Sequence, residues 1–376
     1  MQFKVIISMA ILMVGCSGNE GELHLEWGNA SKLPEEFGKP NLGVAGPLVG
    51  VFGNRLLIAG GANFPEGMPW DGGKKVYQKS AYLYSFEGSE LKFYKQFALE
   101  DASAYSANVN ISDVLYSAGG ENENGAIGEV YRYQLSKGEN LEKTQLPDLP
   151  YPLTNGGLVG GGDHLYFVGG ENSDHVSDKV YQLHLKENGD GWQEYLTLPY
   201  PVSHAVVVSD GLNKIYLIGG RKRNTNSRSD IYDDILEIDI NSKNIRTIGK
   251  LPTAVAAGTG LYYQGKILVF GGDQANTFHK VEDLLGQINL ESNQVKKDSL
   301  IGVKNDIQLN HPGFSKENWA FDLVTGAWMA LEGMQGLSPV TTSAVLKDTI
   351  FVIPSGEIRA GVRTDQILVG KIVGSN

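Results

Sequence analysis

Glu357 and Arg363 lie six positions apart in the segment GEIRAGVRTDQ, which runs from Gly356 to Gln366. A carboxylate beside a guanidinium combines two functions. The Arg holds a substrate carboxylate through two hydrogen bonds, and the Glu moves a proton. Arg359 lies between them and could share the binding of an anion. These three residues therefore predict an acid–base site for a small anionic molecule.

Further polar residues occur at or shortly after a recurring pair of glycines. They are Asn63, Glu121, Glu171, Arg221, Asp273, Asn276 and Glu357. Any one of them alone would most simply be a solvated loop charge or a turn residue. Loops that follow equivalent strands of a closed ring gather around its axis, however, and several polar groups can converge there on a small ligand. We therefore expect these residues to surround one mouth.

The glycine pairs mark an internal repeat in which each pair ends a short apolar run. The runs are RLLIAGG ending at Gly61, VLYSAGG at Gly120, HLYFVGG at Gly170, KIYLIGG at Gly220, KILVFGG at Gly272 and TIFVIPSG at Gly356. In the sixth copy, Ser355 replaces the first glycine. An interval of roughly fifty residues is the period of kelch propeller blades.

Each copy has the neighbours that a four-stranded blade requires. A strand of small residues precedes the apolar run, as suits the crowded position nearest a propeller axis, and a strand of alternating apolar residues follows it. Trp192 and Trp328 mark the fourth strand in two copies. With 48 Gly, 17 Tyr and only 20% charged residues, the chain is predicted to be all-β, a six-bladed kelch-type β-propeller.

The sixth copy ends before a fourth strand can form, and the missing strand is found at the N-terminus. The segment LHLEWGNASKLP, residues 23–34, places Trp27 where Trp192 stands in its own copy. We expect this strand to complete the C-terminal blade, which would remove an exposed sheet edge. The tryptophans are expected to pack between blades.

The propeller is predicted to span residues 23–376 as one domain with an insertion at about residues 273–316 of the fifth copy. Within it, FHKVEDLLGQI, residues 278–288, could form a short amphipathic helix. The insertion is either a lid or wall over the mouth, or an excursion without a role.

Residues 1–15 have the pattern of a secretory signal, with Lys4 followed by the apolar run 5–14. This run is too short to span a bilayer. MVGC, residues 13–16, resembles the lipobox of bacterial lipoproteins, which implies that Cys16 is lipidated and residues 17–22 form a tether. The alternative is a plain signal peptide with an incidental cysteine. We expect an exported lipoprotein of the periplasm or outer membrane, held to the membrane through the lipid alone.

Composition argues against several other functions. A net charge of −11 leaves no basic surface for nucleic acid. The seven His residues show no metal-ligand spacing, so no metal site is predicted. A copper oxidase built on kelch blades needs a Cys cross-linked to Tyr, and Cys16 is the only cysteine.

The chain resembles the N-acetylneuraminate epimerases, also called sialic acid mutarotases, over nearly the whole mature sequence. The similarity rests on GEIRAGVRTD from Gly356, GVAG from Gly43, AGGANFP from Ala59 and GGDQANTFHKVEDL from Gly271. The first segment looks like a family signature that usually lies near the middle of the chain, so this sequence resembles a cyclically permuted branch. Ala360 stands where the family usually has Pro.

The resemblance implies an isomerase without a cofactor that exchanges the α and β anomers of a sialic acid. Glu357 would be the proton acceptor and Arg363 would contact the substrate carboxylate. The further substrate-binding candidates are Arg359, Asn63, Glu121, Glu171, Arg221 and Asn276. The alternative is a non-catalytic kelch propeller that binds glycans or a protein, which would have no need of a Glu and an Arg so placed.

Overall fold

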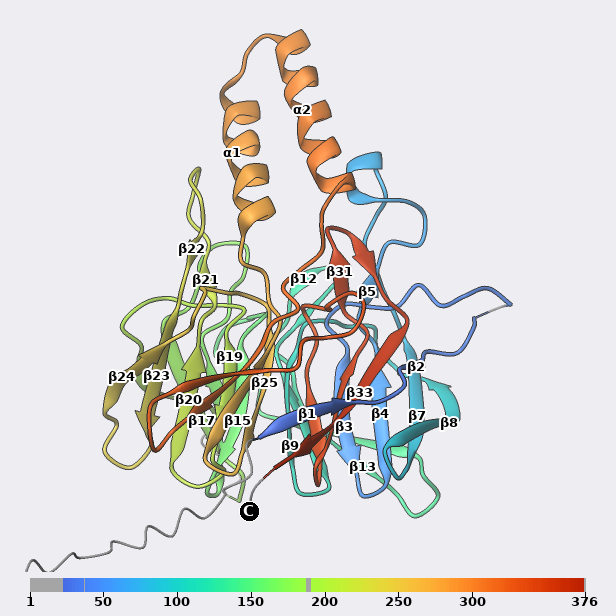
Figure 1. Cartoon of the computed structure of the whole chain (residues 1–376), viewed down its shortest axis with the longest axis vertical. Helices are drawn as coiled ribbons and strands as arrows, with labels where there is room; N and C mark the ends of the chain where they lie inside the picture. The colour runs from blue at the N-terminus through green and yellow to red at the C-terminus, as the bar shows by residue number, and fades with distance from the viewer. Residues whose placement is uncertain (1–22, 37, 187–190, 375–376) are drawn as a thin grey trace, which may run out of the picture.

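The computed structural model describes residues 23–36, 38–186 and 191–374, so the predicted secretory signal, Cys16 and the tether lie outside the described residues. The described residues form six antiparallel sheets around a central axis, with two helices projecting from one face (Figure 1). The predicted six-bladed propeller is confirmed. Neither helix in this part of the chain is both long and apolar enough to cross a membrane.

Blades I to III each run outward from an inner strand at the axis. Blade I consists of β3 (Leu48–Phe52), β4 (Arg55–Ala59), β7 (Ser80–Glu87) and β8 (Glu90–Ala98). Blade II consists of β9 (Ala107–Ile111), β10 (Val114–Ala118), β13 (Val130–Leu135) and β14 (Leu141–Leu146). Blade III consists of β15 (Gly157–Gly161), β16 (His164–Val168), β17 (Lys179–His184) and β18 (Gln193–Thr197).

Blades IV to VI continue the ring. Blade IV consists of β19 (Val206–Ser209), β20 (Lys214–Ile218), β23 (Asp234–Asp239) and β24 (Ile245–Lys250). Blade V consists of β25 (Thr259–Tyr263), β26 (Lys266–Phe270), β27 (Asn318–Asp322) and β28 (Trp328–Leu331). Blade VI consists of β29 (Val345–Lys347), β30 (Ile350–Pro354), β33 (Gln366–Val373) and β1 (His24–Trp27), with β2 (Ser31–Lys32) also paired to β33.

Short hairpins extend four blades on the face where the glycine-pair loops emerge, which we call the mouth. They are β5 (Ala62–Asn63) with β6 (Val76–Tyr77), β11 (Glu121–Asn122) with β12 (Gly125–Ala126), β21 (Arg221–Lys222) with β22 (Asp230–Ile231), and β31 (Glu357–Arg359) with β32 (Val362–Arg363). A 3-10 turn, η1 (Pro69–Asp71), lies between β5 and β6.

The core is divided among the six interfaces between neighbouring blades. In each blade the second strand has five residues, and the last four of them are buried. They are buried because both faces of that strand pack against adjacent blades. Six apolar clusters result, one for each pair of neighbours. The cluster between blades VI and I contains Val49, Ile58, Val352 and Ile367, so the interface that closes the ring is as apolar as the others.

The N-terminal strand completes blade VI as predicted. Trp27 on β1 pairs with Gly370 on β33, and its Nε1 donates a hydrogen bond of 3.1 Å to the Glu332 carbonyl at the end of blade V. Trp192 donates in the same way to Pro147 at 2.8 Å, and Trp328 donates to Lys250 at 2.6 Å. Each tryptophan thus ties its blade to the end of the preceding outer strand. Trp27 makes this bond between segments 305 residues apart.

A ring of backbone hydrogen bonds surrounds the axis at the mouth. In each blade, a residue two to four positions before the inner strand donates its N–H to the carbonyl of the equivalent residue in a neighbouring blade, at 2.7 to 3.2 Å. The six residues are Gly46, Tyr105, Asn155, His204, Ala257 and Thr341. All six have φ between 52° and 64°. This left-handed conformation is costly for a side chain that is not Gly, so the closed ring requires it at every blade. We call this set the axial ring.

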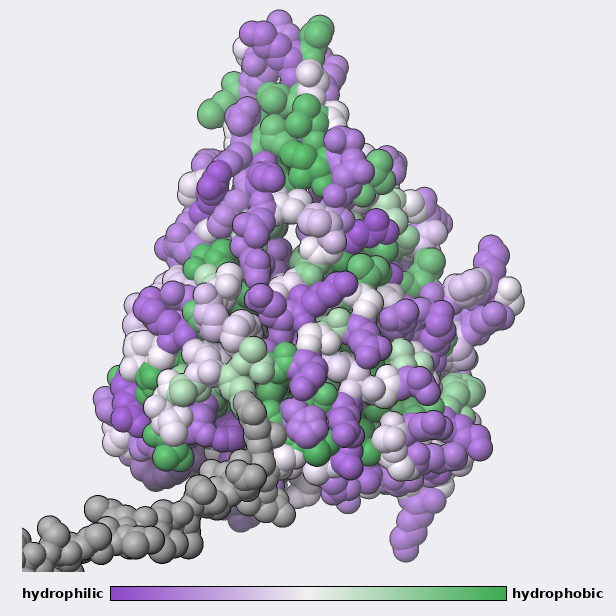
Figure 2. All heavy atoms as spheres, in the orientation of Figure 1, coloured by the Kyte–Doolittle hydropathy of each residue, from purple (hydrophilic) through white to green (hydrophobic). Residues whose placement is uncertain are grey.

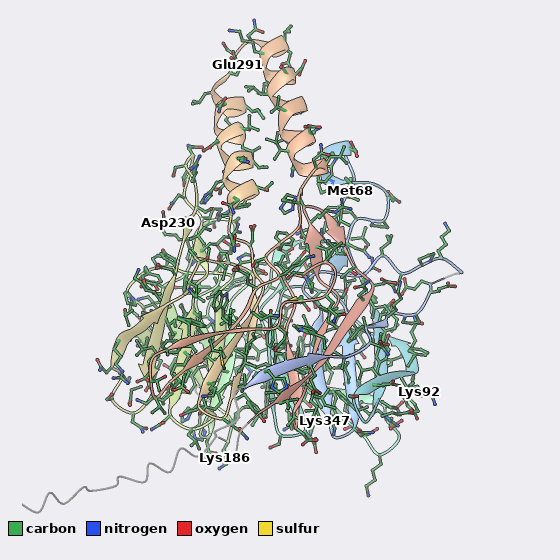
Figure 3. The ribbon with its side chains drawn as sticks, viewed as in Figure 1. Met68, Lys92, Lys186, Asp230, Glu291 and Lys347 are labelled. Carbon is green, nitrogen blue, oxygen red and sulfur yellow. The ribbon has the colours of Figure 1, made fainter. Side chains whose placement is uncertain are left out.

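The insertion in blade V forms a helical hairpin, α1 (Asn276–Leu290) and α2 (Gln294–Leu309), and α1 includes the predicted helix. The hairpin rises from the mouth, with Glu291 near its tip, whereas Lys186 and Lys347 lie at the opposite end of the molecule (Figures 1 and 3). Arg228 on blade IV holds it through two hydrogen bonds to Asp283, at 2.5 and 2.8 Å. Apolar side chains show on the hairpin surface (Figure 2).

Trp27→Ala should lower the free energy of unfolding by about 2–4 kcal/mol, because it removes an indole that packs against Phe351 and bonds to Glu332. Urea unfolding followed by circular dichroism measures the change. Trp192→Ala is the matched control, because it removes the equivalent indole hydrogen bond, to Pro147, between two blades that are joined by the chain. It should lower the free energy of unfolding by a similar amount. An unchanged unfolding midpoint for Trp27→Ala would show that β1 does not hold blade VI shut.

Candidate functional site

The residue that follows each glycine pair occupies the same position in all six blades. In every blade it forms an antiparallel bridge with a residue that precedes the inner strand, next to the axial ring. The six residues are Ala62, Glu121, Glu171, Arg221, Asp273 and Glu357. The mouth is therefore built from six equivalent positions, of which blades II to VI carry a charged side chain.

The sixth glycine pair departs from the pattern for a structural reason. Ser355 takes the left-handed conformation with φ 54°, and its buried hydroxyl accepts a hydrogen bond of 2.8 Å from the Val44 N–H. The same hydroxyl lies 2.7 Å from the Thr364 carbonyl and 2.9 Å from that of Val44. Ser355 therefore joins the strand entering blade I to the loop that carries Glu357 and Arg363.

Glu357 and Arg363 lie opposite each other on the β31–β32 hairpin and form an ion pair, with Nη2 of Arg363 3.2 Å from Oε2 of Glu357. The other carboxylate oxygen accepts a hydrogen bond of 3.0 Å from the Gly361 N–H. Burial raises the pKa of Glu357 above its usual range, and Arg363 opposes that rise. The Glu357 side chain is still 21% exposed. A carboxylate with a raised pKa is a stronger base than one in the usual range, as proton transfer requires.

Arg363 is held from several sides, and its side chain is only 4% exposed. Its Nε donates to the Ala62 carbonyl at 3.3 Å, Nη2 lies 3.4 Å from the Tyr105 hydroxyl, and the guanidinium lies 4.8 Å from the Phe64 ring centre. Among the described residues, its buried Nη1 has no hydrogen-bond partner, and neither has the buried Nε of Arg359. Buried donors of this kind are normally paired, but each guanidinium here keeps one donor without an acceptor among the described residues.

The turn of this hairpin packs on η1 of blade I. Gly361 has φ 73°, and a Cβ added there would lie 3.1 Å from Pro69 Cδ and 3.4 Å from Met68 Sδ. The left-handed backbone therefore disfavours a side chain at this position, and a Cβ would also require Pro69 to shift slightly. Ala360 begins this tight turn, in which Gly361 presents its N–H to Glu357.

A second ionic cluster lies on blades III and IV. Arg221 Nη2 is 3.0 Å from Glu171 Oε1, and Nδ1 of His204 is 3.5 Å from the same oxygen. Although burial favours neutral Glu171, the neighbouring His204 and Arg221 together hold the pKa of that carboxyl below its usual range. Burial, reinforced by Arg221, lowers the pKa of His204 to about 3. Phe278 of α1 lies 5.1 Å from the Arg221 guanidinium, so the helical hairpin forms a wall beside this cluster.

The other predicted site residues are placed differently. Glu121 accepts hydrogen bonds from Lys75 at 2.6 Å and Tyr77 at 2.9 Å. Asn63 is buried, and its amide donates to the Gly43 carbonyl and accepts from Gln78, both at 2.9 Å. Asn63 thus organises the loop rather than presenting a free amide. Asn276 is exposed at the first position of α1.

The structure adds two residues that the sequence reasoning did not select. Tyr105 belongs to the axial ring and reaches Arg363. His311 follows α2 and is 8% exposed, and its Nδ1 accepts a hydrogen bond of 3.0 Å from the Gly313 N–H. Burial lowers the pKa of His311, so its neutral ring carries the proton on Nε2. Neither residue stands next to a glycine pair, which was the signal used to find the others.

A channel of about 560 Å³ continues from the axial ring along the inner strands, lined mostly by small and apolar residues. Within residues 23–36, 38–186 and 191–374, no group of three His, Cys, Asp or Glu side chains could hold a metal ion. The described residues that line this channel include no Asp, Glu, Lys or Arg, so the Glu357–Arg363 and Glu171–Arg221 pairs lie outside the channel, at the mouth.

Comparison with known proteins gives a consistent result. Residues 146–376 match the sequence model of the family described as N-acetylneuraminate epimerase, a segment that includes Glu357 and Arg363. The N-acetylneuraminate epimerase of Haemophilus influenzae (strain PittEE) is 27% identical over 238 residues, which cover 60% of this chain and 59% of that protein. The protein of the same name from Salmonella typhi is 23% identical over 229 residues, or 60% of this chain and 57% of that protein. The match thus spans less than two thirds of the length of these relatives.

The His204 environment predicts how stability depends on pH. Because the pKa of His204 is about 3 in the folded protein and about 6.5 in an unfolded chain, the unfolded state binds the extra proton between those values. The free energy of unfolding should therefore fall as the pH is lowered through this window, by about 1.4 kcal/mol per pH unit from this residue.

Urea unfolding at pH 7, 5.5 and 4 measures this dependence. His204→Asn is the matched variant, because Asn tolerates the left-handed backbone and already occupies the axial ring at Asn155. Its stability should fall less steeply with decreasing pH than that of the wild type. Parallel pH profiles would contradict the role assigned to His204.

Proposed function

The chain belongs to the N-acetylneuraminate epimerase family, and we propose that it is a mutarotase that interconverts the α and β anomers of N-acetylneuraminate or a related sialic acid. The observation that carries this proposal is the Glu357–Arg363 ion pair at the mouth, which lies inside the segment matched by the family. An isomerase of this type needs one group to bind the sugar acid and another to move its proton.

Arg363 supplies the binding group. Its Nη1 is buried and without a partner among the described residues, as is Nε of the neighbouring Arg359. A substrate carboxylate at this point would make charge-assisted hydrogen bonds to guanidinium groups that already lie in place. Such binding would hold the anomeric carbon, which bears the carboxylate, next to Glu357.

Glu357 supplies the base. It accepts the proton of the anomeric hydroxyl, the ring opens to the keto form, and closure on the other face of the carbonyl gives the second anomer. No cofactor enters this scheme. The reaction also proceeds slowly in water, so a positioned base that contributes about 10²- to 10⁴-fold is sufficient.

The remaining mouth residues have supporting functions in this proposal. Glu121, Glu171 and Arg221 carry the hydrogen-bonding groups that sugar hydroxyls and an acetamido group require. Asn63 shapes the loop through Gly43 and Gln78. The wall formed by α1 would limit the length of the substrate on the Arg221 side, because Phe278 stands over that guanidinium.

Glu357→Gln should slow anomer exchange by about 10²- to 10⁴-fold, because the amide cannot accept the proton. NMR exchange or equilibration of freshly released α-N-acetylneuraminate measures the rate. Because burial raises the pKa of Glu357, wild-type activity should decline with falling pH from a point above the usual Glu range.

Glu139→Gln is the matched control. Glu139 lies on the turn between β13 and β14, at the end of blade II away from the mouth, and it forms an ion pair with Arg55. This variant should exchange anomers at the wild-type rate. Equal rates for the wild type and Glu357→Gln would rule out the assigned base. Sugar binding without any exchange by the wild type would favour a glycan-binding propeller instead.

We further propose that Cys16 carries a lipid and that the mouth faces away from the membrane. His24 pairs with Val373 and Lys32 pairs with Gln366, the residue at which β33 leaves the mouth. The chain therefore enters blade VI at the face opposite the Glu357–Arg363 pair. A tether attached there would leave the mouth open to a diffusing substrate.

Cys16→Ser should move the protein from the membrane fraction to the soluble fraction of a bacterial host that processes lipoproteins. Anomer exchange should be unchanged, because the described chain enters blade VI at the face opposite the mouth. Fractionation and immunoblotting follow the protein. Retention of Cys16→Ser in the membrane fraction would contradict the lipid anchor.

A further inference from the structure

Tyr105 carries a large side chain on a left-handed backbone at the mouth. It belongs to the axial ring and has φ 58°, a conformation that is a clear outlier for a bulky residue. Its N–H donates to Gly46 and its carbonyl accepts from Asn155, both across blade boundaries. Strained residues of this kind persist only where neighbouring structure enforces them, and they cluster at functional sites.

The strain places the Tyr105 phenol beside the Glu357–Arg363 pair. Nη2 of Arg363 lies 3.4 Å from the Tyr105 hydroxyl and 3.2 Å from Oε2 of Glu357. One nitrogen atom therefore bridges the phenol and the carboxylate, which puts the two oxygens within reach of a single sugar ring. Lys75 Nζ lies 5.2 Å from the centre of the phenol ring, so two cations flank it.

Ring opening requires more than a base. When Glu357 takes the proton of the anomeric hydroxyl, the bond from the anomeric carbon to the ring oxygen breaks and negative charge develops on that oxygen. An alkoxide is a poor leaving group unless an acid protonates it. Arg363 cannot act as that acid, because a guanidinium keeps its protons in proteins.

We propose that Tyr105 is the general acid for the ring oxygen, a catalytic residue that acts together with Glu357. This assignment rests on the proposed mutarotase function. Gly46 and Ala257 occupy the equivalent axial-ring positions of other blades, so the ring itself does not require a large side chain there. A catalytic role accounts for a tyrosine at this position despite its left-handed backbone.

The step balances without a further reactant. The Tyr105 O–H bond breaks as its proton passes to the ring oxygen, and the anomeric C–O bond to the ring opens as the carbonyl forms. The resulting phenolate is stabilised by Arg363 and Lys75. On closure the phenolate recovers the proton from the attacking hydroxyl, and Glu357 returns its proton to the carbonyl oxygen.

Two other titratable groups at the mouth, His311 and Glu171, fit this role less well. Nδ1 of His311 accepts from Gly313, so the neutral ring could release only its Nε2 proton and would become an imidazolate. Glu171 is tied to Arg221 and has a pKa below its usual range, so it holds no proton near neutral pH. Tyr105 has an O–H bond to give. Burial raises the pKa of its phenol, so the phenol keeps its proton near neutral pH, and Arg363 and Lys75 oppose that rise by stabilising the phenolate.

Tyr105→Phe tests the assignment, because it removes one oxygen and leaves the backbone preference unchanged. We expect kcat for anomer exchange to fall at least about 100-fold, with KM within threefold of the wild type, because Arg363 still binds the carboxylate. Tyr200→Phe is the matched control, since Tyr200 contacts Asp234 and Tyr232 rather than Glu357 or Arg363, and it should retain the wild-type kcat.

Lys75→Met is a second variant that does not depend on the fold tolerating a change in the axial ring. Its side chain is partly exposed, and its loss should lower kcat about tenfold by removing a cation from beside the phenolate. Wild-type kcat in Tyr105→Phe would overturn the assignment while leaving the mutarotase function intact. Absence of exchange by the wild-type protein would instead overturn the proposed function itself.

Discussion

Six backbone hydrogen bonds close the axial ring, and the position of every mouth residue depends on them. Each bond joins neighbouring blades at 2.7 to 3.2 Å, and each of the six residues adopts a left-handed backbone to make it. The residue after each glycine pair is bridged to the chain just before this ring. The ring therefore fixes how closely the six loops approach the axis, and the strain that it imposes is offset by the apolar interfaces between the blades.

Blade VI is where this ring is joined without a peptide bond between its ends. The Gly46 N–H donates to the Thr341 carbonyl, and Ser355 and Trp27 add side-chain bonds between segments more than 300 residues apart. The loop with Glu357 and Arg363 is attached directly to this junction through Ser355. Closure of the ring and the geometry of the Glu357–Arg363 ion pair are thus coupled. Loss of β1 from blade VI would also loosen the hairpin that carries Glu357.

The fold and the central ion pair could be predicted from the sequence because both leave a local pattern. Repeated apolar runs with glycine pairs predict the blades, Trp27 predicts the closing strand, and a Glu and an Arg six positions apart predict a paired site. Tyr105 and His311 leave no such pattern, because they reach the mouth through a backbone conformation and a long insertion. The role of Asn63 was equally invisible, since its partners Gly43 and Gln78 are 20 and 15 residues away in the sequence and become neighbours only when blade I folds.

The charge at the mouth is divided unevenly between its two halves. Glu171 with Arg221 and Glu121 with Lys75 largely neutralise each other, whereas Arg363 and Arg359 each retain a buried donor without a partner among the described residues. Burial raises the pKa of both Glu357 and Asp273, which weakens the negative charge on this half. Since the net charge of −11 repels an anion and salt screens that repulsion beyond about 8 Å, anion binding must depend on these close guanidinium groups.

A carboxylate bound at Arg363 would share its positive charge with Glu357 and so weaken the interaction that lowers the Glu357 pKa. Substrate binding would therefore make Glu357 a stronger base at the moment when a proton must be taken.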